Sequence, residues 1–293
     1  MAARTSPSER QRRLGAELRK LRKRAGLSGD AAGALLDADR TRISHIEAGR
    51  MDVPRNGLYR LLRSYGCPEG PLFDGLMDMA HDRGRGWWDE YRDMAVPVMR
   101  DLAELESGAA HIRIHEPLFI PGMLQTREYA HAVISALEPE SGRADRLVEF
   151  RVDRQRVLTG DRPTPYHAVI SESALRVLVG SEKIMRKQLL RLIELARLPH
   201  VTVQVFPFRA GAYSAYCGPF VLFQGSAPGL DTVYFDRPVD SAFTGDGDRV
   251  RKYARLFEQL ASSALAPVDP EAPPESHESQ DSLGLIQHIM YDL

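Results

Sequence analysis

The chain has 293 residues, which is enough for two ordinary domains. Its hydrophobic content of 43% and charged content of 27% are typical of a soluble globular protein with a core. No apolar run approaches the roughly 20 residues that cross a bilayer, and the polar, basic segment Met1–Arg13 is no secretory signal. Only two cysteines occur, Cys67 and Cys217, without a neighbouring Cys or His cluster. This argues against a disulfide framework or structural zinc and favours a cytoplasmic location.

The charge is distributed unevenly along the chain. Residues 1–65 hold 15 Lys+Arg against 7 Asp+Glu, a net of +8, whereas the rest of the chain holds 24 against 33, a net of −9. A basic head on an acidic body indicates that the head meets a polyanion. The alternative is a merely solvated basic tail.

Helical signals follow one another through the head. Leu14, Leu18 and Leu21 recur at helical spacing, and Gly26 ends that helix. Ser28 is a good N-cap for a second, short helix, Asp37-Ala38 forms a turn, and Asp39 caps a third helix. The expected helices are Glu9–Ala25, one from Ser28 through Leu36, Arg40–Ala48, Asn56–Tyr65 and Leu72–His81.

Two short helices joined by a tight turn form a helix-turn-helix, whose second helix enters the major groove of DNA. Ile43 and Ile46 should point inward, so the opposite side of that helix faces outward and can reach base edges. Arg50 and Arg55 are placed to neutralise phosphates. The candidate DNA-binding residues are Arg40, Thr41, Arg42, Ser44, His45, Arg50 and Ser28.

The stretch LRKLRKRAGLSGDAAGALLDADRTRISHIEAGR resembles the repressor-like, XRE-type helix-turn-helix family. The match is strong at Leu27-Ser28, Leu36, Ile43-Ser44, Ile46-Glu47 and Gly49. Three positions depart from the family: Gly29 stands where Gln is frequent, Gly33 where Ala is usual, and Asp37 where the turn usually carries Gly. Each helical glycine costs about 1 kcal/mol relative to Ala, while Asp tolerates turn conformations.

The remaining sequence predicts an α+β domain with a small mixed sheet. A helix should run from about Trp87 through Leu105, with Pro97 bending or interrupting it. Further expected helices are Gln125–Leu137, Arg143–Leu158, Ser173–Val179, Ser181–Arg197 and Asp246–Ser262, and the expected strands are His111–His115, Tyr166–Ile170, Val201–Val205, Phe220–Phe223 and Thr232–Phe235. The predicted domains are 1–81, 82–263, a disordered linker 264–281 and a short amphipathic helix 282–293.

The motifs WWDEYRDM, IHEPLFIPGMLQTREYAHAVI, LPHVTVQVFPFRAGAY and GPFVLFQ resemble the C-terminal domain of unknown function in the WhiJ-like regulators of actinobacteria. The resemblance covers about residues 10–263. It implies regulation of development or specialised metabolism, and a small partner protein of the BldB-like type in an antitoxin-like pairing.

No catalytic or cofactor motif is found, and we expect neither an enzyme nor a cofactor. His111 and His115 lie about 13 Å apart along one strand, too far to share a metal, so we expect exposed histidines and no metal site. Weaker candidates for a ligand or partner contact are Trp87, Trp88, Tyr91, Phe119, Gln125 and Tyr213, for which an ordinary packing role is the alternative.

The pattern as a whole favours a sequence-specific DNA-binding regulator that acts as a homodimer on double-stranded DNA and whose body senses a ligand or partner protein. The alternative is an antitoxin-like interaction protein that holds a small partner, with DNA binding only autoregulatory.

Overall fold

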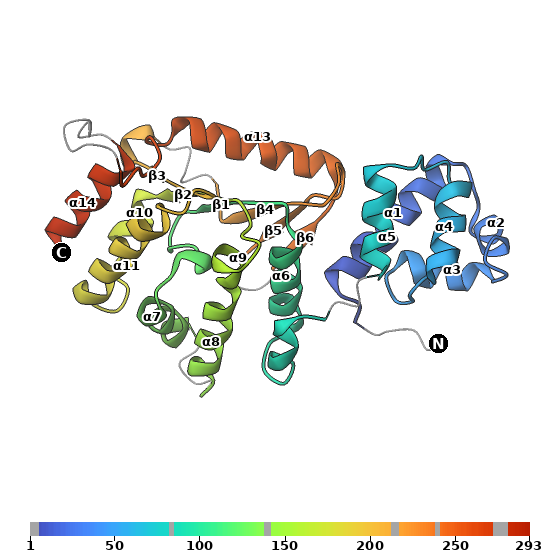
Figure 1. Cartoon of the computed structure of the whole chain (residues 1–293), viewed down its shortest axis with the longest axis horizontal. Helices are drawn as coiled ribbons and strands as arrows, with labels where there is room; N and C mark the ends of the chain where they lie inside the picture. The colour runs from blue at the N-terminus through green and yellow to red at the C-terminus, as the bar shows by residue number, and fades with distance from the viewer. Residues whose placement is uncertain (1–5, 82–84, 138–141, 212–216, 238–240, 272–280) are drawn as a thin grey trace. The chain divides into compact units, whose positions relative to one another are not determined.

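The structure is a computed structural model, and it describes residues 6–81, 85–137, 142–211, 217–237, 241–271 and 281–293 (Figure 1). The chain forms two compact units. The first unit comprises Met1–Arg92, Val96–Gly108 and Gly225–Asp231, and the second comprises Asp93–Ala95, Ala109–Gln224 and Thr232–Leu293. Within the described ranges, no helix has the length and apolar content to cross a membrane.

The first unit is mainly helical in its described part, and its helices before residue 82 share one apolar cluster. Leu18, Ile43, Leu58 and Leu62 are among its most deeply buried members. The helices are α1 (Glu9–Arg24), α2 (Gly29–Ala34), α3 (Arg40–Glu47), α4 (Arg55–Ser64), α5 (Pro71–His81), the 3-10 helix η1 (Trp87–Tyr91) and α6 (Pro97–Gly108). All five helices expected before residue 81 are present, and the helix expected from Trp87 through Leu105 is interrupted before Pro97.

This unit extends beyond the boundary predicted at residue 81. Arg10 pairs with Glu104 at 2.5 Å and Arg12 with Asp101 at 2.9 Å, which ties α1 to α6. Residues 225–231 also belong to it, since Ala227 and Leu230 lie in the same apolar cluster. These contacts join positions about 90 or more apart, so no local sequence signal could have predicted them.

The second unit contains an open, mixed, six-stranded sheet. Its strands are β1 (His111–Glu116), β2 (Tyr166–Ser171), β3 (Val201–Phe206), β4 (Phe220–Gln224), β5 (Thr232–Phe235) and β6 (Ala242–Thr244). The order is β3-β2-β1-β4-β5-β6, with β1, β2 and β3 parallel and β4 to β6 alternating in direction. The predicted α+β class with a mixed sheet is therefore confirmed. The three-residue edge strand β6 was not predicted.

Helices cover both faces of this sheet (Figure 1). Figure 1 draws α13 along one face, and α7, α8, α9 and α11 on the other. The helices of the second unit are α7 (Arg127–Leu137), α8 (Ala144–Arg154), α9 (Arg156–Thr159), α10 (Glu172–Arg176), α11 (Glu182–Leu195), α13 (Gly247–Ser263) and α14 (Ser282–Asp292), with the 3-10 helices η2 (Gly122–Leu124) and η3 (Phe208–Ala210). Side chains such as Ile112, Val169, Val203 and Leu222 are thus buried.

The expectation of exposed histidines was wrong for His115, which is fully buried. Its Nδ1 lies 3.1 Å from the carbonyl oxygen of Val169 on β2. Burial lowers the pKa of His115 to about 4, so the ring is neutral at physiological pH. Helices cover both faces of β1, and the alternation of polar and apolar residues along the strand could not predict that its polar side is buried.

The first residues of the predicted disordered linker 264–281 are ordered and pair with the sheet. The backbone amides of Leu265 and Val268 donate to the carbonyl oxygens of Val205 and Val203 on β3 at 2.9 and 2.8 Å. Residues 272–280 lie outside the described residues. The segment after α13 therefore continues along the sheet before the chain reaches α14.

Candidate nucleic-acid interface

The helix-turn-helix is formed by α2 and α3. The Ser28 hydroxyl accepts a hydrogen bond from the amide of Ala31 at 3.0 Å, which caps α2. The Asp39 carboxylate accepts from the amide of Arg42 at 2.8 Å, which caps α3. Between the two caps, Asp37 has φ of 51°, the left-handed conformation in which Asp replaces the more common Gly. Local residue chemistry thus sets the start of both helices.

The two unusual glycines have physical reasons in this turn. A Cβ added at Gly33 would lie 2.5 Å from the carbonyl oxygen of Ala38, so a larger residue would collide with the turn backbone. A Cβ added at Gly29 would lie 2.9 Å from Cγ of Arg40. Gly29 therefore leaves room for the Arg40 side chain beside the start of α2.

The two sides of α3 differ in burial, as a recognition helix requires. Ile43 and Ile46 are 2% and 3% exposed and hold the helix to the core. On the other side, the exposed candidates are Arg40, Thr41, Arg42 and Ser44, and His45 is half-buried. Arg50 lies exposed just after the helix, and Ser28 is exposed at the start of α2. The structure thus presents the candidate side chains to solvent, and their contact with DNA stays a prediction.

Helix α1 fixes the carboxyl end of α3. A Cβ added at Gly15 would lie 2.5 Å from the carbonyl oxygen of Glu47, so the two helices meet at backbone distance. The Arg22 guanidinium binds both oxygens of Glu47, at 2.5 and 2.9 Å, and donates to the carbonyl of Leu27 at 2.7 Å. Glu47 raises the pKa of Arg22 mainly through this hydrogen bonding. Residue types alone did not identify this clamp.

Most arginines near the start of α1 are paired inside the first unit. Arg10, Arg12 and Arg13 have carboxylate partners in Glu104, Asp101 and Glu17. By contrast, no ion pair within the described part of the chain involves Arg40, Arg42, Arg50 or Arg55. The arginines of α3 and of the start of α4 are therefore available to a polyanion, whereas Arg10, Arg12 and Arg13 are not.

The aromatic candidates near Trp87 serve mainly in packing. Trp88 and Tyr91 are 8% and 5% exposed, and the Trp87 ring lies edge-on to both, with centroids 5.9 and 6.1 Å apart. Phe119 is 37% exposed on the loop after β1, whereas Gln125 is buried and hydrogen-bonded. Tyr213 lies outside the described residues.

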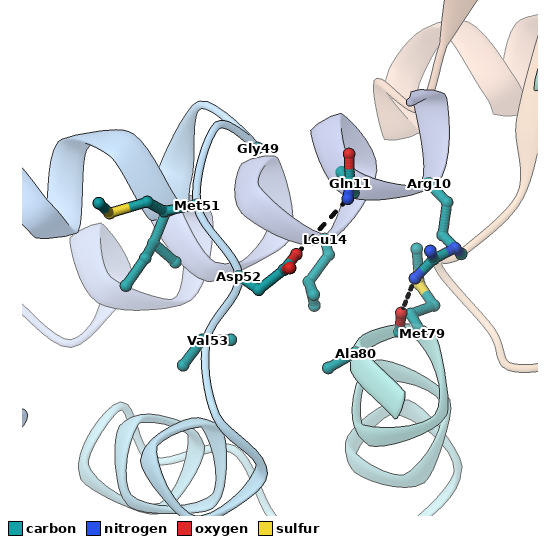
Figure 2. A pocket seen from close by; sticks show the side chains of 10 residues that line it. Arg10, Gln11, Leu14, Gly49, Met51, Asp52, Val53, Met79 and Ala80 are labelled. Carbon is teal, nitrogen blue, oxygen red and sulfur yellow. Dashed lines mark hydrogen bonds between the residues drawn. The ribbon is translucent and has the colours of Figure 1, made fainter. Parts of the chain in front are cut away.

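A small pocket lies in the first unit, between α1, the α3–α4 connection and the end of α5 (Figure 2). Figure 2 shows Gln11 donating to Asp52 at 3.5 Å and Arg10 donating to the carbonyl oxygen of Met79. Its polar groups therefore bind one another, and we assign it no ligand. Its lining residues are Arg10, Gln11, Leu14, Ile46, Gly49, Met51, Asp52, Val53, Met79 and Ala80.

Among the described residues, no group of three or more His, Cys, Asp or Glu side chains could hold a metal ion.

Comparison with protein families gives two matches. The model of a helix-turn-helix domain matches residues 13–73, which contain the α2–turn–α3 arrangement. The model of a domain of unknown function, DUF5753, matches residues 99–270. Neither the curated proteins nor the solved structures give a match. Since the second model covers more than half of the chain, the protein belongs to the DUF5753 family and carries a helix-turn-helix domain ahead of that domain.

Proposed function

We propose that this protein is a sequence-specific, DNA-binding transcriptional regulator of the XRE type, similar to the WhiJ-like regulators of actinobacteria. The observation that carries the proposal is the exposed pair Arg40 and Arg42 on α3, without ion-pair partners among the described residues, opposite the buried Ile43 and Ile46. Guanidinium groups bind guanine edges in the major groove, and neighbouring hydroxyl groups can bind any base.

We further propose that the protein acts in the cytoplasm as a homodimer. One helix-turn-helix covers only half of a two-fold operator, and a second copy supplies the other half. The second unit has its own sheet and core, and in this proposal it senses a ligand or a small partner protein and alters how two copies fit the operator.

The test begins with selection of binding sites from random double-stranded DNA by the full chain. We expect one two-fold sequence to be enriched and bound at least about 1,000-fold more tightly than random DNA at physiological salt. The logarithm of its affinity should fall with the logarithm of salt concentration, by about 0.9 per phosphate neutralised.

Two double variants with the same change in charge separate recognition from bulk electrostatics. The pair Arg40→Ala and Arg42→Ala should abolish the preference for the selected sequence. The pair Arg186→Ala and Arg249→Ala removes two exposed arginines of the second unit, neither in an ion pair within the described ranges, and should retain it. Equal losses would contradict the proposal. No enriched sequence at all would favour the interaction-protein alternative.

A further inference from the structure

A second candidate site lies at the carboxyl edge of the parallel strands in the second unit. β1, β2 and β3 are parallel. β4 lies between β1 and β5 and is antiparallel to both, so β5 runs in the same direction as β1. Glu116, the last residue of β1, and Asp236, directly after β5, therefore lie at the same edge. β2 and β3 lie on one side of β1 in the sheet, and β4, β5 and β6 lie on its other side. In open α/β sheets, ligands bind outside the carboxyl ends of the parallel strands.

Helix α8 brings two arginines to this edge. The Nη1 group of Arg151 donates to Oε1 of Gln125 at 3.0 Å. A Cβ added at Gly122 would lie 3.7 Å from Nη1 of Arg154 and 4.0 Å from Cδ of Arg151, so both side chains pass the backbone of η2. Gln155 donates to the carbonyl oxygens of Gly122 and Gln125, at 3.3 and 2.7 Å, and fixes this loop on α8.

Arg151 and Glu116 do not neutralise one another by direct contact. Among the described residues, the Arg151 guanidinium has one hydrogen bond, to a neutral amide, although it carries five N–H donors. The Glu116 carboxyl group has neither a hydrogen bond nor an ion pair with any of them. Burial and then Arg154 lower the pKa of Arg151 to about 10, so it stays charged at neutral pH. Burial and then Asp236 raise the pKa of Glu116 to about 8, despite Arg151.

We propose that Glu116, Gln125 and Arg151 form a binding site for a small organic anion, a carboxylate or phosphate ester that also carries a hydroxyl or carbonyl group. Arg151 takes the anionic group through its unused N–H donors. The neutral carboxyl group of Glu116 donates to the adjacent oxygen of the ligand. This site would be the ligand-sensing site of the proposed regulator. Only its regulatory role rests on the proposed function, whereas the binding of an anion does not.

The experiment measures thermal unfolding of the full chain at constant ionic strength with lactate or inorganic phosphate, without DNA. We expect at least one probe, at about ten times its dissociation constant, to raise the melting temperature by roughly 2–4 °C. A response to lactate alone identifies a carboxylate ligand, and a response to phosphate alone identifies a phosphate ester. Absence of any response to either probe overturns the proposal.

The matched variants are Arg151→Gln and Arg156→Gln. Arg156 is 63% exposed and pairs with Asp153 at 2.8 Å, so its variant should keep the response. Arg151→Gln should lose it even if its own melting temperature changes, because the readout is the difference with and without probe. An unchanged response in Arg151→Gln contradicts the assignment.

The pH dependence of lactate or phosphate binding gives a readout that a merely structural role of Glu116 would not affect. Among the described residues, the titratable and charged groups around Glu116 are Asp236, Arg151, Arg154 and the buried Tyr129, whose pKa is about 12. Above pH 8 the wild-type carboxyl group ionises and repels the anion, so the response should fall between pH 7 and 9. Glu116→Gln should remove this decline, and a decline equal to that of the wild type would contradict the role of Glu116. If the protein failed to bind DNA in separate assays, the proposed function would be contradicted, but the anion-binding results would still hold.

Discussion

The start of α1 and the exposed side of α3 carry the same residue type with different surroundings. Arg10, Arg12 and Arg13 have carboxylate partners within the first unit. Arg40 and Arg42 have none among the described residues. The first group is committed to holding helices together, and the second is available to a polyanion.

A count of basic residues therefore overstates the positive charge available to DNA. The net charge of +8 over residues 1–65 includes Arg10 and Arg12, whose acidic partners lie in α6, beyond that range. The position of acidic partners, and not the number of arginines, decides which cations can bind phosphate.

The largest expected effect concerns the clamp between α1 and α3. Arg22→Ala leaves Glu47 partly buried and unpaired, which should lower the free energy of unfolding by about 3 kcal/mol. Urea denaturation measures this. The control Arg19→Ala removes an exposed arginine of the same helix and should change stability by less than about 0.5 kcal/mol. Similar values for both variants would show that the clamp is not stabilising.

The outward side of α3 should behave in the opposite way. Arg42→Ala and His45→Ala should each weaken binding to the selected operator by about 1–3 kcal/mol, because base contacts are lost. Their free energies of unfolding should stay within about 0.5 kcal/mol of the wild type. Unchanged operator affinity in both variants would mean that another side of the helix faces DNA.

Loss of a phosphate contact should weaken DNA binding less than loss of a base contact, and equally for all sequences. Arg50→Ala should reduce affinity for the operator and for random DNA by the same factor, and lower the magnitude of the salt slope by about 1. Binding titrations at several salt concentrations measure both quantities. A change in preference at a single base pair would instead assign Arg50 to base recognition.

The smallest effect tests the fit between α2 and Arg40. Gly29→Ala should leave stability unchanged or raise it by up to about 1 kcal/mol, since Ala favours the helix. The added Cβ must displace the Arg40 side chain, which lies 2.9 Å from its position, so operator affinity should fall by a few fold. Full affinity would show that Arg40 adapts or does not contact DNA.

The features that the sequence predicted are those encoded by near neighbours. The cap at Asp39 and the spacing of Ile43 and Ile46 determine the position and face of α3. The burial of His115 and the pairing of Arg12 with Asp101 depend on segments 54 and 89 residues away, which no periodicity describes. Gln125 was singled out as a weak candidate, but its neighbours Arg151 and Glu116 were not, because only the fold brings β1, η2 and α8 together.

The participation of residues 225–231 in the first unit affects how the protein is made. A Cβ at Gly75 would lie 2.7 Å from Leu230 and 3.3 Å from Ala227, so α5 packs directly on this late segment. During synthesis, at about 5–20 residues per second, α1 to α6 must wait several seconds for that segment to emerge. Until then an apolar surface on α5 stays uncovered on the nascent chain. The DNA-binding unit therefore completes its core only after most of the sheet has been translated, and a chain that ends before residue 225 carries an incomplete DNA-binding unit.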